Sequence, residues 1–186
     1  FLQRADQVLK HRIEVIAGRE EARLIYLGVS RLQPSELPRL VIDIGGRSTE
    51  MILGHGRTPI RKESFSIGSV SMSMQHFPQG RFTAENFRSA QIAAGAELEE
   101  ALAQFERNLW QEALGSSGTV SAVSQILSAS GITDGSITPE GLRWCIERCI
   151  EAGSAELLSL PGLKAERRPV LARGLCILST LASPFN

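Results

Sequence analysis

The chain has 186 residues, and its 20 basic and 20 acidic side chains leave no net charge. Ordinary apolar and charged fractions indicate a globular fold that buries about 70% of the unfolded surface, rather than a disordered chain. The interspersed charges form no polybasic stripe, which argues against nucleic-acid binding and requires a local site for any anionic ligand. No signal peptide is recognisable and no run approaches about 18 apolar residues, so no transmembrane segment is expected.

The first half of the chain is expected to be rich in strands. A helix ends near residue 10, and a second begins at Gly18, with Glu20 and Glu21 in its first turn, where the helix dipole favours carboxylates. That helix fades into a proline-containing loop at 33–38. The apolar patterns and the turns at Gly45-Gly46 and 55–57 predict the strands that follow. The strands expected are 13–16, 39–44, 49–54 and 58–67.

The second half is expected to be mainly helical. Thr83 starts a long helix, and Thr138-Pro139 places a capping residue before a proline at the first helical position. Helices are expected at 68–77, from 83 onward, and at 119–130, 139–152, 154–159 and 165–182, with a weak strand at 110–114. Strands followed by helices predict an α/β fold whose mixed layer contains an antiparallel hairpin. Because the chain begins inside a running helix pattern, we expect a piece of a longer protein.

Residues 41–50, Val-Ile-Asp-Ile-Gly-Gly-Arg-Ser-Thr-Glu, form the most informative segment. Asp43 stands at the end of an apolar strand, Gly45-Gly46 permit a sharp turn close to a ligand, and Glu50 precedes the next apolar run. Backbone N–H groups in such a turn create a concavity for anions, and the flanking acids suit hydrated Mg²⁺. The alternative is an ordinary tight hairpin with glycine at positions of positive φ.

Residues 115–119, Gly-Ser-Ser-Gly-Thr, make a second glycine loop, between a weak strand and a helix. Backbone N–H groups at a helix N-terminus suit an anion or the edge of a nucleotide. Taken alone, the segment is equally well explained as a Gly-Ser linker. Beside the first loop in one α/β chain, it becomes a candidate for the second of two ligand loops.

Glu20 and Glu21 are the most interesting acids outside these loops. Adjacent helical residues point about 100° apart, so at most one of the two can face a given cleft. A glutamate near a bound phosphate can take a proton from an attacking water. The position of both acids in a first helical turn is explained just as simply by the helix dipole, and mechanics alone favours that interpretation.

The remaining reactive side chains point to no chemistry of their own. The chain lacks the Gly-x-Ser-x-Gly pattern, which argues against a hydrolase with a covalent serine. We expect the histidines on the surface or in turns and the cysteines as buried helix thiols in a reducing cytosol, not as zinc ligands or a disulfide. These residues are His11, His55, His76, Cys145, Cys149 and Cys176.

Several blocks together resemble the Ppx/GppA phosphatases, the exopolyphosphatases and guanosine pentaphosphate phosphohydrolases. Residues 14–28 look like the segment that carries the catalytic glutamate of that family. Residues 41–50 resemble its Asp-Ile-Gly-Gly-Gly-Ser-Thr-Glu loop, residues 66–70 its Gly-Cys-Val block with Ser69 in place of cysteine, and residues 115–119 its Gly-Ala-Ser-Gly-Thr loop. The blocks that look closer to the exopolyphosphatase branch are 77–80, 85–87 and 159–163.

The resemblance implies an actin-like fold of the sugar kinase, Hsp70 and actin superfamily, in which two related α/β domains close on phosphate. Residues 1–28 would be the tail of the first domain and residues 29–186 most of the second. The phosphate loop of the first domain is absent from the sequence, so we expect the isolated fragment to be inactive. For the full-length protein the resemblance implies a cytoplasmic homodimer, with peripheral membrane association as an alternative.

By position in the family motifs, Glu21 would be the catalytic glutamate, Glu20 a structural residue, and Asp43 and Glu50 the acids near Mg²⁺, with a K⁺ requirement left open. The phosphate-binding residues implied are Gly45, Gly46, Arg47, Ser48, Thr49, Gly115, Ser116, Ser117, Gly118 and Thr119. Arg47 departs from the glycine usual in the family. It would either grip a phosphate or, if the backbone there needs positive φ, strain the loop.

The reaction expected is Mg²⁺-assisted hydrolysis that releases terminal phosphate from inorganic polyphosphate, with Glu21 as the general base. One alternative within the same family is guanosine pentaphosphate as the substrate. An actin-like kinase that transfers phosphate from ATP is a second alternative, and a non-catalytic phosphate-binding fragment is a third.

Overall fold

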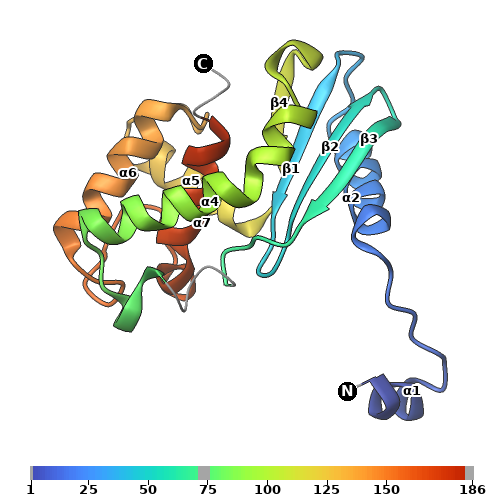
Figure 1. Cartoon of the computed structure of the whole chain (residues 1–186), viewed down its shortest axis with the longest axis horizontal. Coiled ribbons are helices and arrows are strands. Elements are labelled where there is room, and N and C mark those ends of the chain that lie inside the picture. The colour runs from blue at the N-terminus through green and yellow to red at the C-terminus, as the bar shows by residue number, and fades with distance from the viewer. Residues whose placement is uncertain (1, 71–75, 183–186) are drawn as a thin grey trace.

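The computed structural model describes residues 2–70 and 76–182, which form a four-stranded sheet and the helices around it (Figure 1). The helices are α1 (Leu2–Leu9), α2 (Gly18–Leu32), α4 (Ala84–Gln104), α5 (Gly118–Ala129), α6 (Pro139–Ala152) and α7 (Arg168–Ala182). Short 3₁₀ turns are η1 (Pro78–Gly80), η2 (Arg107–Leu109) and η3 (Ala165–Arg167). The strands are β1 (Arg39–Ile44), β2 (Thr49–His55), β3 (Thr58–Phe65) and β4 (Glu112–Gly115).

The sheet is mixed, with the strand order β3-β2-β1-β4. Strands β1 and β2 form the predicted antiparallel hairpin, in which Asp43 lies opposite Glu50, and β3 continues it antiparallel to β2. Strand β4 runs parallel to β1, with Gly115 opposite Ile42. Parallel neighbours end at the same edge of a sheet, so the segments that follow β1 and β4 must emerge together.

The side chains of the central strands alternate between two cores. Val41 and Ile52 pack against Ala22 and Tyr26 of α2 on one face of the sheet. Leu40, with Met51 and Leu53, joins the larger core built with the remaining helices on the other face, because successive strand residues point to opposite sides. Helix α2 therefore lies alone behind the β1–β3 hairpins, as Figure 1 shows. The predicted boundary at residue 28 falls inside this continuous helix, and the division into domains stays a prediction.

The helix boundaries of the second half agree with the predicted capping signals. The side chain of Thr83 accepts a hydrogen bond from the N–H of Asn86, and that of Thr138 accepts one from Gly141, each at 3.1 Å. Gly153 ends α6 in the left-handed region, at φ 73°. The cysteines are free and buried, as expected.

Two predicted elements are wrong. Residues 13–16 are irregular rather than a strand, since no neighbouring strand lies beside them and Val15 is 78% exposed. Residues 154–159 form a turn rather than a helix, because Gly153 ends α6 and the N–H of Ala155 then donates to the carbonyl of Gly80. Strand β3 also ends at Phe65 instead of residue 67. The helix predicted at 68–77 falls largely on residues 71–75, outside the described residues.

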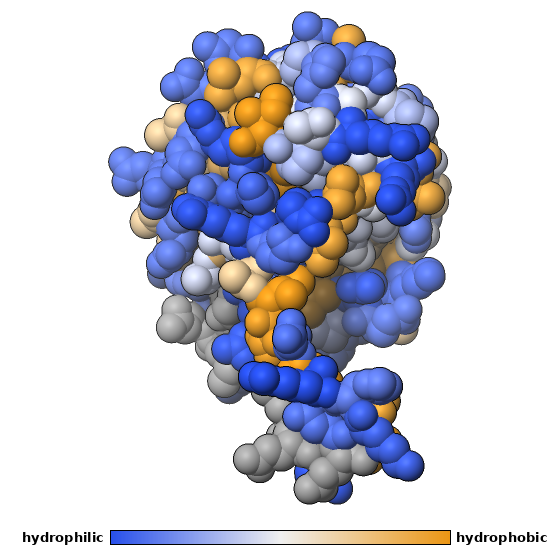
Figure 2. All heavy atoms as spheres, turned by 90° about the vertical axis from the view of Figure 1, so that its right-hand side faces the viewer, coloured by the Kyte–Doolittle hydropathy of each residue, from blue (hydrophilic) through white to orange (hydrophobic). Residues whose placement is uncertain are grey.

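Apolar side chains are exposed on the α2 side of the molecule. Leu24 and Leu32 of α2 and Ile16 of the preceding segment are 47%, 85% and 46% exposed, respectively. Figure 2, which views this side, shows apolar surface that continues down toward the narrow connection to α1. No described helix is both long and apolar enough to cross a membrane.

Candidate functional site

The two glycine loops lie at the same edge of the sheet and line one cavity of about 430 Å³. Strands β1 and β4 are parallel neighbours, so the loops that follow them are brought together. The backbone N–H of Ser116 donates to the carbonyl of Ile42 at 3.0 Å, and the Ser116 hydroxyl donates to Asp43 Oδ2 at 2.5 Å. The residues that line the cavity are Asp43, Ile44, Gly45, Gly46, Ser69, Val70, Ser116, Ser117, Gly118, Thr119, Arg167 and Val170.

The first loop is shaped by close backbone contacts. The N–H of Gly45 donates to the Ser48 carbonyl at 2.9 Å, and the N–H of Ser69 donates to the Gly45 carbonyl at 2.9 Å. A Cβ at Gly68 would lie 2.5 Å from the carbonyl carbon of Gly46. Neither Gly45 nor Gly46 has a positive φ, so the alternative of a hairpin with glycine at positive φ is wrong. Close approach of the backbone explains these glycines instead.

The second loop is the N-terminus of α5. The side chain of Ser117 accepts a hydrogen bond from the N–H of Val120 at 3.3 Å, as an N-cap does. Thr119 packs against Gly174 of α7, where an added Cβ would lie 2.1 Å from Thr119 Cγ2. Side-chain contacts therefore cap this loop onto α5 and hold it against α7.

Unpaired backbone N–H groups from both loops are available to an anion. Among the described residues, the N–H groups of Gly46, Arg47 and Ser48 donate to no other residue, and neither do those of Ser117, Gly118 and Thr119. The first set lies in a turn and the second at a helix N-terminus, which carries partial positive charge. This arrangement suits a group with several negatively charged oxygens, such as a phosphate.

Arg167 of η3 lies over the second loop and lines the cavity, although the sequence did not single it out. A Cβ at Gly118 would lie 2.4 Å from a terminal nitrogen of the Arg167 guanidinium. Arg167 and Arg168 stand just before and at the start of α7, where the helix dipole disfavours cations. A cation at this unfavourable position is the sequence feature from which Arg167 could have been identified.

The predicted acids gather beside the loops. Glu50 is only 1% exposed, and the Ser64 hydroxyl donates to its Oε1 at 2.8 Å. Burial raises the pKa of Glu50, hydrogen bonds from Ser64 and Ser48 lower it, and the negative charges of Glu21 and Asp43 raise it further. Glu21 and Asp43 thus each lie within electrostatic reach of Glu50, although Glu21 and Glu50 do not line the cavity itself.

Glu20 and Glu21 differ in their surroundings. Arg23 Nη2 lies 2.6 Å from Glu20 Oε1, and this hydrogen bond lowers the pKa of Glu20. Glu21 is exposed and close enough to Glu50 to affect its pKa. Glu20 is therefore engaged within its own helix, while the charge of Glu21 acts on Glu50.

Arg47, Ser48 and Thr49 do not line the cavity. Arg47 is exposed and its φ is not positive, so the strained alternative for this residue is wrong, while its predicted contact with phosphate stays a prediction. The hydroxyl of Thr49 is buried and donates to the carbonyl of Ile67 at 2.7 Å. In the structure Thr49 thus holds the segment after β3, and its role in phosphate binding also stays a prediction.

Asp43 and Glu50 fit a magnesium ion by the chemistry of their donors. In the described part of the chain, no three acidic, histidine or cysteine side chains lie close enough to enclose one metal ion. Magnesium usually takes only one or two carboxylates, together with water and substrate phosphate oxygens. Two oxygen donors beside the cavity lined by the glycine loops therefore match magnesium better than a metal that needs a complete protein cage.

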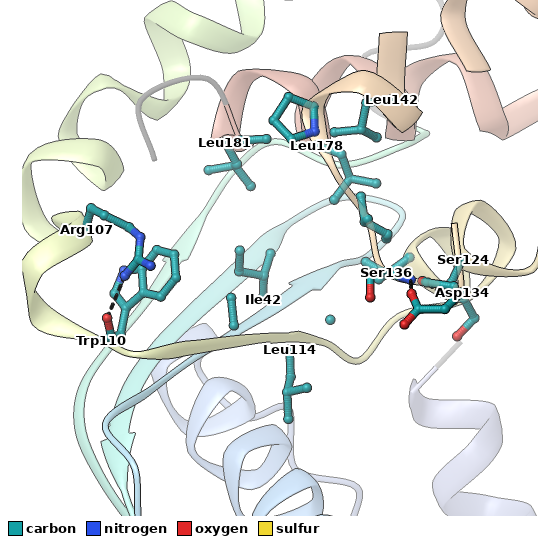
Figure 3. Close-up of a pocket in the computed structure, with 18 residues that line it drawn as sticks. Ile42, Arg107, Trp110, Leu114, Ser124, Asp134, Ser136, Leu142, Leu178 and Leu181 are labelled. Carbon is teal, nitrogen blue, oxygen red and sulfur yellow. Dashed lines mark hydrogen bonds between the residues drawn. The ribbon is translucent and has the colours of Figure 1, made fainter. Parts of the chain in front are cut away.

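A larger cavity of about 760 Å³ lies along β4 (Figure 3). Its floor and walls are mainly apolar, with Ile42 and Leu114 from the sheet and Leu178 from α7. At one end the Arg107 guanidinium stacks 4.2 Å from the centre of the Trp110 ring. This groove is lined by neither the 45–49 turn nor the N-terminal residues 116–119, which distinguishes it from the smaller cavity.

The comparisons with known proteins agree with this geometry. The model of the Ppx/GppA phosphatase family matches residues 1–186. A candidate exopolyphosphatase of Haemophilus influenzae is 39% identical over 100% of this chain and 58% of its own length. A guanosine-5'-triphosphate,3'-diphosphate pyrophosphatase of Pseudoalteromonas atlantica is 40% identical over 97% of this chain and 36% of its own length.

Solved structures show the same fold. The Aquifex aeolicus PPX-GPPA enzyme matches with a TM-score of 0.79 and 21% identity, over 99% of this chain and 62% of that chain. An exopolyphosphatase from Cytophaga hutchinsonii matches with a TM-score of 0.76 and 20% identity, over 98% of this chain and 61% of that chain. The α/β fold of the chain is therefore the actin-like fold of these enzymes, and the chain spans about three fifths of their length. The chain belongs to the Ppx/GppA phosphatase family.

Proposed function

We propose that the chain forms part of a phosphohydrolase that releases terminal phosphate from inorganic polyphosphate. The observation that carries this proposal is that the two glycine loops line one cavity, beside three acids. Among the described residues, the N–H groups of Gly46 and of 117–119, which line this cavity, donate to no other residue. Backbone N–H groups bind phosphate oxygens without regard to what the phosphate is attached to. The acids beside them supply what a hydrolase needs in addition, which is a base for water.

In this proposal Glu21 takes the proton from the attacking water. It stands next to the acid cluster and, unlike Glu20, forms no ion pair with Arg23. The N–H groups of the two loops hold the transferred phosphate, and Arg167 adds a fixed positive charge over the second loop. Phosphoryl transfer depends mainly on such positioning and charge neutralisation.

Asp43 and Glu50 would hold Mg²⁺, and a bound Mg²⁺ ion would neutralise charge on the phosphate oxygens. The hydroxyl of Ser116 orients the Asp43 carboxylate, while Ser64 and Ser48 donate to Glu50. These donors keep the oxygens of both acids in fixed directions. Carboxylates that are already oriented lose little freedom when a cation binds.

Polyphosphate is proposed ahead of guanosine pentaphosphate because the blocks at 77–80, 85–87 and 159–163 look closer to the exopolyphosphatase branch. Guanosine pentaphosphate remains the second candidate, since a relative that is 40% identical is named a guanosine-5'-triphosphate,3'-diphosphate pyrophosphatase. Both substrates end in the same phosphoanhydride, so the two loops would treat them alike.

The experiment is phosphate release from polyphosphate and from guanosine pentaphosphate, measured for the complete product of the gene and for the 186-residue chain. We expect the complete product to prefer polyphosphate and the 186-residue chain to bind it without turnover. If the complete product instead prefers the nucleotide, guanosine pentaphosphate would replace polyphosphate as the proposed substrate. Transfer from ATP to an acceptor, without phosphate release from either substrate, would instead favour the kinase alternative.

A further inference from the structure

The first residue of α2 packs directly on Ser64 of β3. A Cβ at Gly18 would lie 2.5 Å from both Cβ and Oγ of Ser64. The hydroxyl could rotate away from such a contact, but the Ser64 Cβ is fixed to the backbone of β3. A side chain at position 18 would therefore push apart the start of α2 and the strand.

The other side of Ser64 touches the acid cluster. Ser64 lies opposite Glu50 in the β2–β3 ladder, and its Oγ donates to Glu50 Oε1 at 2.8 Å. Glu50 is 1% exposed, so water cannot replace this hydrogen bond. One small side chain thus contacts both the start of α2 and a buried acid.

The position of Glu21 depends on the same helix start. Its N–H donates to the carbonyl of Ala17 at 3.0 Å, within the first turn that Gly18 opens. A displacement of this turn would be passed to Glu21, which lies less than one helical turn farther along.

We propose that Ser64 is a positioning residue, which fixes the start of α2 and thereby Glu21 relative to Glu50. This inference rests on the proposed function, because Glu21 matters for turnover only if it acts on the attacking water. Ser64 does not line the phosphate cavity and bonds to Glu50, so its effect is on the geometry of the acids rather than on the binding of phosphate.

The first test is Gly18→Ala in the complete gene product. We expect kcat to fall about 10- to 100-fold, the range for a displacement of about 1 Å in a catalytic group, while KM changes less than about 2-fold. The matched control is Gly28→Ala in the same helix, where nothing lies within 4 Å of an added Cβ. The control should keep both constants, so a general effect of alanine in α2 is excluded.

The second test combines Gly18→Ala with Ser64→Gly, which removes the obstacle as well as the hydroxyl. Ser64→Gly alone should lower kcat, because Glu50 loses one of its two serine donors. Adding Gly18→Ala to this variant should lower kcat by less than about a further 2-fold. Full additivity of the two losses, or an equal loss in Gly28→Ala, would overturn the proposal.

Hydrogen exchange in the 186-residue chain separates this proposal from the proposed function. The amides of Glu20 and Glu21, both bonded to the Ala17 carbonyl, should exchange faster in Gly18→Ala than in wild type or Gly28→Ala. The double variant should restore slower exchange. If the complete gene product releases no phosphate, the proposed function fails, yet this exchange pattern still decides whether Ser64 fixes the helix start. Unchanged exchange in Gly18→Ala would refute the coupling.

Discussion

The two glycine loops that line the smaller cavity are built in different ways. The first is held mainly through its backbone. The carbonyls of Gly45 and Gly46 accept from the N–H groups of Ser69 and Val70, and the Ser69 hydroxyl adds a bond to Gly45. Gly68 lies against this loop without room for a side chain. The second is held by side chains, with Ser117 as the N-cap and Thr119 packed on Gly174. Backbone N–H groups are therefore presented in two ways, by close backbone packing in the first loop and by the capped N-terminus of a helix in the second.

The largest effect should come from an acid that belongs to neither loop. Glu21→Gln in the complete gene product should reduce polyphosphate hydrolysis at least ~100-fold without loss of folding, because a general base typically contributes 10²–10⁴-fold. Steady-state phosphate release measures this loss. The adjacent Glu20→Gln is the matched control and should have a small effect, since Glu20 pairs with Arg23. Equal losses in the two variants would remove Glu21 from its assigned role.

The contrast between the loops should appear in two glycine substitutions. Gly68→Ala should lower the free energy of unfolding by about 1–3 kcal/mol and weaken phosphate binding, because the added methyl meets the backbone of Gly46 and Arg47. Gly118→Ala meets only the end of the flexible Arg167 side chain, so its cost should stay below about 1 kcal/mol. Thermal melts and phosphate titrations measure both effects. A reversed order would contradict the distinction between the loops.

The two arginines near the loops should also differ. Arg167→Gln should weaken binding of polyphosphate about 10- to 100-fold, the range for one lost charge-assisted hydrogen bond. Arg47→Gln should weaken it less than about 5-fold, because Arg47 is exposed and does not line the cavity. Titration calorimetry at fixed ionic strength compares them. A larger loss for Arg47 would make it, rather than Arg167, the cation that grips phosphate.

The smallest effect concerns stability and pH. Burial raises the pKa of Glu50, so its ionised form is disfavoured in the folded protein. The resulting loss of stability sets in as pH rises through the folded pKa and disappears below the ordinary pKa of the group. Glu50→Gln should therefore raise the melting temperature at about pH 8, and by less at about pH 4. A gain independent of pH would mean that the Glu50 charge does not limit stability.

Local signals explain which parts of the fold could be predicted. The β1–β2 hairpin follows from apolar runs on either side of Gly45-Gly46, and the start of α6 from the cap at Thr138. The short apolar run at 13–16 carries no such signal, because a strand needs a neighbour that periodicity does not reveal.

Contacts between distant segments explain what was missed at the site. Arg167 reaches Gly118 from η3, and Ser64 joins the start of α2 to Glu50 across two strands. Neither contact follows from spacing along the chain, since each depends on the packing of elements that lie far apart in sequence. Asp43 and Glu50 could be found because one hairpin turn separates them, and a hairpin turn is recognisable in the sequence.

The three cysteines provide a measure of unfolding that needs no added probe. Cys145, Cys149 and Cys176 are the only thiols of the chain, and all are buried on α6 and α7. Burial raises the pKa of Cys145 and of Cys149 to about 12, so few reactive thiolates exist in the folded protein. A thiol reagent should therefore label only molecules in which these helices have separated, and the labelling rate reports the population of that opened state.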